Sequence, residues 1–172
     1  MPNSPRPCDT LPRILLQATT GGDICLADVP GTSVLIVYPW TGRPGLPNPP
    51  IWDDIEGAHG STPELEGFRD LAVEFGRLDV GLFGLSRQTT DYQREMAARL
   101  GLRFPILSDA DNRMASALKL PSFSTGGETY LKRLTLVVSA GIIQAVFFPV
   151  PDPAPHASEV FAWLERKAIA GC

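Results

Sequence analysis

Hydrophobic positions along the chain follow two different periods, and their alternation predicts an α/β domain. Continuous apolar, β-branched runs occur at residues 34–38 and 80–86, and the first run stops at Pro39. Runs of this kind are typical of strands buried on both faces of a sheet. Further strands are predicted at residues 14–18, 24–26, 105–108, 134–138 and 142–148. The first pair flanks a Gly-Gly turn and the last pair flanks Gly141, so each pair is expected to form a β-hairpin.

A second set of segments has apolar residues three or four positions apart, which predicts helices. The segment that opens at Ser61 places Leu65, Phe68 and Phe75 on one face. Other helices are predicted at residues 91–100, 111–118 and 157–168. Strands that alternate with amphipathic helices indicate a central mixed β-sheet with helices on both faces, preceded by an N-terminal β-hairpin.

The length of 172 residues fits a single domain with a sizeable core. Residues 1–10 are predicted to be a flexible leader and residues 11–172 one domain. Prolines gather in a long predicted loop at residues 41–60. Two interpretations of residues 40–59 stay open: a cover over a pocket, with Trp40, Ile51 and Trp52 on its underside, or an excursion packed on the surface. The prolines favour a preformed wall over a swinging lid.

Composition excludes several classes of function. The net charge of −4 offers no basic surface for nucleic acid, and no apolar run approaches the roughly 20 residues that span a bilayer. The N-terminus lacks the apolar core of a signal peptide, which favours a cytoplasmic protein. Three cysteines and two histidines at scattered positions match no recognised metal spacing, so neither a metal nor another cofactor is expected.

Five stretches of the sequence together resemble a known family. They are Tyr38-Pro39 and residues 60–70, 83–86, 104–109 and 133–138. In these stretches the chain resembles the Q-type, or bacterioferritin-comigratory, peroxiredoxins, and the likeness extends over about residues 11–168. The resemblance implies a thioredoxin-like fold and a pocket at the start of the helix that opens at Ser61. In that family a cysteine thiolate at this position attacks the O–O bond of a peroxide and becomes a sulfenic acid.

The chain departs from the family at the positions that carry its chemistry. Ser61 stands where the peroxide-reacting cysteine is expected, and Glu66 stands where many Q-type members have their second cysteine. Arg133 matches the active-site arginine. A helix N-terminus stabilises an anion by about 1 kcal/mol, and one pKa unit corresponds to about 1.4 kcal/mol. The dipole therefore cannot bring a serine hydroxyl near neutrality, and Ser61 is not expected to act as a peroxidatic nucleophile.

The candidate site combines these residues with their neighbours in sequence. Ser61 and Arg133 occupy the catalytic positions, and the pocket lining is predicted to include Tyr38, Pro39, Trp40, Thr41, His59 and Thr62. Other interpretations remain open at this stage. Ser61 or Thr62 would also serve as a helix N-cap, with Glu64 as a capping-box partner.

Several individual residues have competing interpretations. His59 is either a solvated loop residue or a base for Ser61. Arg133 is either a surface strand residue or part of the pocket, and Arg69 is expected to pair with charges on its own helix. Among the cysteines, Cys25 is expected to be a small buried residue and Cys172 an exposed thiol. Cys8 is a candidate for a thiol relocated to the pocket.

Three functions follow as hypotheses. The first is a peroxiredoxin-like protein without thiol peroxidase activity, whose pocket binds a small anionic or oxygenated molecule or supports different chemistry. The second is a one-cysteine peroxidase carried as a Cys-to-Ser variant at position 61. The third is an interaction module that uses the proline-rich loop. A thioredoxin-type reductant is expected as a partner only if a redox thiol is present, and the chain is expected to be a monomer or weak dimer.

Overall fold

A five-stranded mixed sheet forms the centre of the molecule in a computed structural model, which describes residues 4–167. The strand order is β5-β4-β3-β8-β9. β3 is parallel to β4, and β4 is parallel to β5, whereas β8 and β9 run antiparallel to their neighbours. The bounds are Thr32–Val37 for β3, Val80–Ser86 for β4, Ile106–Ser108 for β5, Leu134–Ser139 for β8 and Ile142–Phe147 for β9. The predicted mixed sheet is confirmed.

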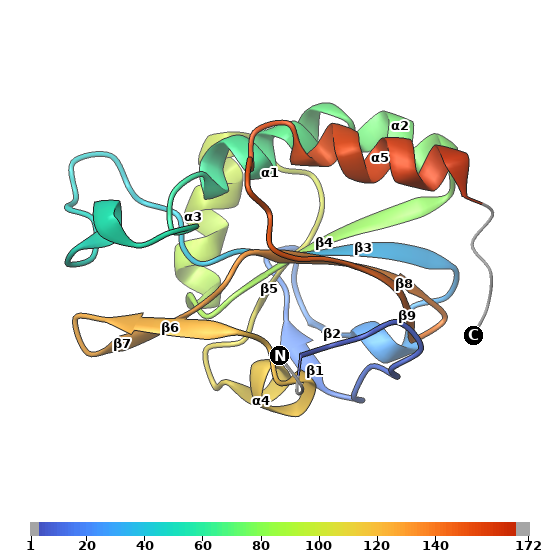
Figure 1. The fold of residues 1–172 in the computed structure, drawn as a ribbon, viewed down its shortest axis with the longest axis horizontal. Helices are drawn as coiled ribbons and strands as arrows, with labels where there is room; N and C mark the ends of the chain where they lie inside the picture. Colours follow the sequence, from blue (N-terminus) through green and yellow to red (C-terminus); the bar gives the residue numbers. More distant parts are fainter. Residues whose placement is uncertain (1–3, 168–172) are drawn as a thin grey trace.

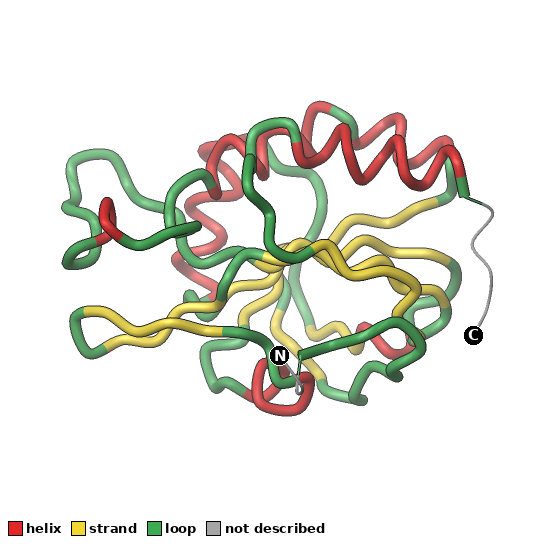
Figure 2. The backbone as a smooth tube through the Cα atoms, viewed as in Figure 1, coloured by secondary structure: helices red, strands yellow, loops and turns green. Residues whose placement is uncertain are grey.

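Both faces of this sheet are covered (Figure 1). One face packs against α1, α2, α3 and α5, and Figure 2 shows α1, α2 and α5 above the strands, in the places that Figure 1 labels. Their bounds, with that of α3, are Ser61–Asp70 for α1, Ala72–Arg77 for α2, Thr90–Leu100 for α3 and His156–Arg166 for α5. The other face packs against α4 (Arg113–Leu118), the short helix η1 (Leu26–Asp28), and the hairpin of β1 (Leu15–Gln17) and β2 (Asp23–Cys25). Helices on both faces and an N-terminal hairpin are confirmed.

Alternation along β3 explains its uninterrupted hydrophobic run. Leu35 and Val37 belong to the core cluster on the α4 side, whereas Val34 and Ile36 belong to the cluster under α1 and α5. Successive side chains of a strand point to opposite faces, so a strand with a core on each side needs apolar residues at every position. Tyr38, just after β3, joins the second cluster and is fully buried.

Some predicted elements differ from those observed. The helix that begins at Ser61 is broken at Leu71, and α2 follows as a separate helix. α4 starts at Arg113 rather than at 111, because Asp109 accepts hydrogen bonds from the backbone N–H groups of Met114 and Ala115. α5 begins at His156, and the predicted end at residue 168 lies outside the described residues.

A hairpin that the hydrophobic pattern did not predict projects from the sheet. It consists of β6 (Ser122–Thr125) and β7 (Glu128–Leu131), joined at Gly126 and Gly127. Both glycines have positive φ, which this tight turn requires. The Gly-Gly pair was therefore a usable signal for a hairpin, although the flanking residues are too mixed in polarity to be predicted as strands.

The long loop before α1 is packed against this hairpin at one end of the sheet (Figure 1). Trp52 begins the short helix η2 (Trp52–Asp54), is buried, and contacts the rings of Trp40, Phe123 and Tyr130. The Thr125 hydroxyl donates to the carbonyl oxygen of Pro50 at 2.6 Å. These contacts make the loop a preformed wall.

The end of the predicted leader lies along the free edge of β9. The backbone N–H of Cys8 donates to Ile143, and that of Leu11 donates to Gly141, both at 2.8 Å. The N–H of Ile143 donates back to Asp9 at 2.9 Å. In residues 4–167, no helix combines the length and the hydrophobicity that crossing a membrane requires.

Candidate functional site

Helix α1 begins after a position that only glycine can occupy without strain. Gly60 is the N-cap, with φ of 106°, and a Cβ added there would lie 2.6 Å from Cγ of Pro153. Ser61 is therefore the first helical residue, and no side chain caps the helix. The predictions that Ser61 or Thr62 is the cap and that Glu64 completes a capping box are wrong, because the chain enters the helix through a left-handed glycine.

The side chain of Ser61 instead meets a buried arginine that reaches it from the start of β8. Nη2 of Arg133 donates to Oγ of Ser61 at 3.1 Å, and Nη1 of Arg133 donates to Oε1 of Glu64 at 3.0 Å. Nη2 also lies 3.0–3.3 Å from the carbonyl oxygens of residues 57–59. All three side chains are almost completely buried. Arg133 is thus a buried residue of the site and not a surface strand residue.

Burial dominates the electrostatics of this group. It raises the pKa of Glu64 to about 7, against the opposing effect of Arg133. Within the described part of the chain, Oε2 of Glu64 and Nε of Arg133 have no hydrogen-bond partner. Burial likewise raises the pKa of Tyr38 above its ordinary value. The Arg133 guanidinium is therefore shielded from solvent. The carboxyl group that balances its charge, that of Glu64, has a pKa close to neutral pH.

A small hollow of about 220 Å³ opens in front of Ser61. We call it the Ser61 hollow. Its lining consists of Trp40, Gly42, Asn48, Trp52 and residues 58–63. Trp40, His59 and Thr62 therefore line the same hollow as Ser61. Tyr38 is buried in the core beneath the site, and Pro39 lines a different hollow on the side of α3.

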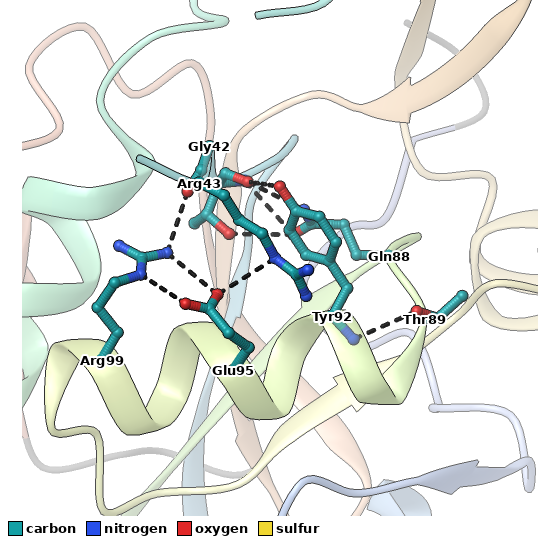
Figure 3. A network of polar contacts seen from close by, with 8 residues as sticks. Gly42, Arg43, Gln88, Thr89, Tyr92, Glu95 and Arg99 are labelled. Carbon is teal, nitrogen blue, oxygen red and sulfur yellow. Dashed lines mark hydrogen bonds and ion pairs between the residues drawn. The ribbon is translucent and has the colours of Figure 1, made fainter. Parts of the chain in front are cut away.

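Thr41, also predicted to line the pocket, is turned towards α3. Its carbonyl oxygen accepts from the hydroxyl of Tyr92 at 2.7 Å and from Nε2 of Gln88 at 3.2 Å. Figure 3 shows the same network continuing to Gly42, whose carbonyl accepts from Nη2 of Arg99 at 3.0 Å. Thr41 therefore does not line the Ser61 hollow. Its hydrogen bonds hold the wall of the hollow against α3.

Arg43 extends this fastening. Its guanidinium lies 4.1 Å from the ring centroid of Tyr92, and its Nε lies 3.3 Å from Oε2 of Glu95 (Figure 3). Glu95 also accepts from Arg99 at 2.9 Å. The beginning of the long loop is therefore clamped to the exposed face of α3.

His59 does not interact with Ser61. Its Nε2 pairs with Oδ1 of Asp53 at 2.5 Å, and both side chains are more than half exposed. The hydrogen-bond partner of Ser61 Oγ is Arg133. The geometry of a serine nucleophile with a histidine base is therefore not present, and the interpretation of His59 as a solvated loop residue holds.

The remaining charged residues of α1 are Glu66, Arg69 and Asp70, and Arg69 donates to the carbonyl oxygen of Leu100 at 2.7 Å. Oε2 of Glu66 lies 3.5 Å from Nη1 of Arg69, and the Glu66 side chain is 39% exposed. Arg69 also donates to Asp70 at 2.8 Å, as expected for charge pairing on a helix. Glu66 therefore points away from the hollow in which Ser61 lies.

The described cysteines lie away from the site. Cys25, half-buried rather than buried, belongs to β2 on the opposite face of the sheet from α1. The backbone of Cys8 is hydrogen-bonded to Ile143, which pairs with Val138, five residues along β8 from Arg133. At about 3.3 Å per residue this separation is about 17 Å, so Cys8 does not supply a thiol to the pocket. Cys172 lies outside the described residues.

Glu64 is the residue that sequence reasoning missed as part of the site. It was read as a possible capping residue, but it lies four positions before Phe68 and therefore on the buried face of α1. An acidic residue within the apolar stripe of a helix was the available signal. Among residues 4–167, no group of three or more acidic, histidine or cysteine side chains is placed to hold a metal ion.

Comparisons with known proteins agree with this architecture. The chain is 25% identical over 161 residues to a chloroplastic peroxiredoxin Q of Sedum lineare, covering 91% of this chain and 76% of that protein. Peroxidoxin BcpB of Mycobacterium tuberculosis is 25% identical with a TM-score of 0.75, covering 94% of this chain and 97% of that one. A Cys-to-Ser mutant of PrxQ from Xylella fastidiosa has the same fold, with a TM-score of 0.76 at 22% identity and coverage of 94% and 96%.

These likenesses confirm the thioredoxin-like fold of a peroxiredoxin. Residues 56–146, which hold α1, Glu64 and Arg133, match the family model described as AhpC/TSA family. The chain therefore belongs to the AhpC/TSA family and resembles its Q-type peroxiredoxins.

Proposed function

We propose that this protein is a redoxin that does not reduce peroxides with a thiol, and that its Ser61 hollow binds a small anionic or oxygenated molecule. One observation carries the proposal: a hydroxyl oxygen, Ser61 Oγ, occupies the start of α1 and lies 3.1 Å from Nη2 of Arg133. A thiolate at a helix N-terminus beside an arginine is strongly stabilised, but a serine hydroxyl there stays protonated. The site keeps its electrostatic arrangement without an atom that a peroxide can oxidise.

The geometry of α1 supports binding of an anion or a polar oxygen. The backbone N–H groups at the beginning of a helix lack partners within the helix and attract negative charge. The amide of Glu64 is already bonded to the carbonyl of Gly60 at 3.0 Å, and Pro63 has no N–H. The amides of Ser61 and Thr62 are the remaining donors of this turn. A volume of about 220 Å³ is below the usual range for drug-sized ligands and suits a molecule of a few heavy atoms.

Peroxide consumption tests the chemical half of the proposal. We expect the unmodified chain to reduce hydrogen peroxide no faster than free thiols do. Ser61→Cys should gain a thiol with a pKa below the ordinary 8.5 and react with peroxide faster by orders of magnitude. Thr62→Cys, in the same turn but not beside Arg133, is the matched control and should gain much less. Comparable rates for the unmodified chain and Ser61→Cys would contradict the proposal.

Tryptophan fluorescence tests the binding half. Trp40 and Trp52 line the Ser61 hollow, whereas Trp163 lies on α5. Titration with acetate should change the emission, and titration with acetamide, which has the same shape without the charge, should change it less. No saturable response to acetate, formate or phosphate would remove the support for an anion in this hollow.

A one-cysteine peroxidase carried as a Cys-to-Ser variant is the second candidate. Two observations favour it: Arg133 is positioned as a thiolate would require, and a solved Cys-to-Ser mutant of the PrxQ type has the same fold. Recovery of peroxide reduction in Ser61→Cys is expected from both candidates. The codon at position 61 of the natural gene separates them, because only a natural serine fits the first proposal.

A further inference from the structure

A second and larger cavity lies on the other side of the segment that carries Ser61. It has a volume of about 460 Å³ and is lined by Glu56, Gly57, Phe123, Lys132, Arg133 and residues 148–151. We call it the Phe148 cavity. The linings of the Phe148 cavity and the Ser61 hollow have no residue in common. Residues 56–57 line the Phe148 cavity, and residues 58–63 line the Ser61 hollow. Its volume is within the usual range for small-molecule sites.

Part of the wall of this cavity is apolar and is held in place by packing. Phe123 stacks on Tyr130 with ring centroids 5.6 Å apart and also contacts Trp52. On the opposite wall, Val150 is buried and fixes the proline-rich segment that follows β9. Phe148 is 39% exposed and belongs to the cavity lining. A ligand in the cavity would therefore bury the exposed part of this ring.

The charges at the cavity have opposite signs but different environments. Lys132 is partly buried, and in residues 4–167 no acidic side chain forms an ion pair with it. Arg133 is 3% exposed, and its charge is already paired with Glu64. Glu56 also lines the cavity but is exposed, so solvent screens its charge more strongly than that of the buried cation. The interior of the cavity therefore favours a negative group beside Lys132.

We propose that the Phe148 cavity is a second binding site, which takes a small amphipathic carboxylate. The apolar chain of the ligand packs against Phe123, Phe148 and Val150, and its carboxylate lies beside Lys132. This site neither includes Ser61 nor depends on the chemistry proposed for the Ser61 hollow. It has the aromatic walls and the few convergent polar groups that mark ligand sites in general.

Calorimetric titration with butyrate, hexanoate and octanoate tests the apolar half of the proposal. Burial of each additional CH₂ group contributes about 0.8 kcal/mol, which corresponds to an affinity about fourfold higher per carbon. We expect affinity to rise along this series while the chain still fits within the cavity. Equal affinity for butyrate and octanoate would overturn the proposal, because the chain would then not be buried.

Paired charge variants test the carboxylate half. Lys132→Gln should weaken octanoate binding by up to about fivefold, whereas Glu56→Gln should leave it unchanged or strengthen it by up to about twofold. Octanol, which has the same chain without the charge, should bind the unmodified protein more weakly than octanoate. If octanol binds equally well, or if Lys132→Gln has no effect, the assignment of an anionic ligand is wrong.

A wall variant with a matched control locates the ligand. Phe148→Ser should reduce octanoate affinity about tenfold, or about 1.4 kcal/mol, since the ring is part of the proposed contact and only its exposed part is newly buried by the ligand. Leu78→Ser, at a site of nearly equal exposure (38%) at the end of α2, should not change it. Thermal unfolding of both variants confirms that they fold. Equal octanoate affinity in the two variants would show non-specific binding and overturn the proposal.

Discussion

The two hollows that flank residues 56–63 use the same buried arginine in opposite ways. On the Ser61 side, the two terminal nitrogens of the guanidinium donate to Glu64, Ser61 and the carbonyl groups of residues 57–59. On the Phe148 side, Arg133 is one lining residue of a larger space that also has aromatic walls and a lysine. The first is a small site built by backbone and hydrogen bonds. The second is built by side-chain packing.

This difference between the two hollows shows what holds Ser61 in position. The Ser61 side is fixed by a network in which each polar group restrains another, and such networks lose stability sharply when one member is removed. The Phe148 side depends on apolar contact area, which tolerates change more gradually. Variants that remove polar members should therefore affect the Ser61 side far more than the Phe148 side.

The largest effect is expected from breaking the buried pair. Glu64→Leu removes the oxygen that accepts from Nη1 of Arg133 at 3.0 Å, an acceptor that a protonated Glu64 or a glutamine would keep. It therefore leaves a buried charged donor unsatisfied, and changes of this kind cost about 3–5 kcal/mol. Urea unfolding at neutral pH measures the loss. Glu66→Leu, on the exposed side of the same helix, is the control and should change stability by about 0.5 kcal/mol or less. A small effect of Glu64→Leu would show that the Ser61 side does not depend on this pair.

Gly60, the N-cap of α1, leaves no room for a side chain next to Pro153. Gly60→Ala combines positive φ with a Cβ placed 2.6 Å from Cγ of Pro153, so we expect a loss of about 3 kcal/mol. Gly57→Ala also has positive φ but nothing within 4 Å of the added Cβ, and a loss of about 1 kcal/mol is expected. Thermal unfolding of the two variants separates the cost of a side chain at positive φ from the cost of a steric clash with Pro153. Equal losses of stability in the two variants would mean that Pro153 moves away from the added Cβ at no measurable cost.

The pH dependence of stability tests the dry environment of Glu64. Its folded-state pKa of about 7 lies above the ordinary value of 4.5. The folded state therefore holds a proton that the unfolded chain releases in this range. The stabilisation is complete below about pH 4.5 and is lost as the pH rises through about 7. Glu64→Gln, which does not titrate, should gain about 1–3 kcal/mol relative to the unmodified chain over this range.

Urea unfolding of both proteins at about pH 5 and about pH 8 measures this difference. His156 has a pKa lowered by burial and therefore contributes the opposite slope, but it is present in both proteins and cancels in the comparison. A parallel pH dependence for the two proteins would show that Glu64 titrates normally.

The smallest effect is expected at the clamp on α3. Tyr92→Phe removes the 2.7 Å hydrogen bond to Thr41, whose carbonyl still accepts from Gln88, so the loss should be about 1 kcal/mol. Acrylamide quenching of Trp40 should increase as the wall of the Ser61 hollow loosens. Tyr130→Phe, in the aromatic cluster under Trp52, is the control and should change neither stability nor quenching measurably. Identical behaviour of the two variants would show that the clamp does not hold the wall.

Much of the fold could be predicted from local patterns. The buried strands at 34–38 and 80–86 and the helix opening at Ser61 follow from periodicity, which depends on neighbouring residues alone. The β6–β7 hairpin was missed because its strands lie outside the central sheet and their burial comes from Trp52 of a distant loop. The N-cap of α1 could not be predicted from nearby residues. The need for a glycine at position 60 comes from Pro153, which lies about 90 residues later in the chain and leaves no room for a side chain there.

The amino-acid sequence by itself determined that this chain is a mixed α/β domain of peroxiredoxin type with oxygen, not sulfur, at position 61. Only the tertiary structure decided that Arg133 reaches Ser61 and Glu64 together, that Thr41 turns towards α3, and that His59 turns to Asp53. The physical reason is the separation along the chain between the residues that interact. Side-chain period and turn chemistry act between near neighbours, whereas the partners of a buried charge are set by which distant segments the core brings together.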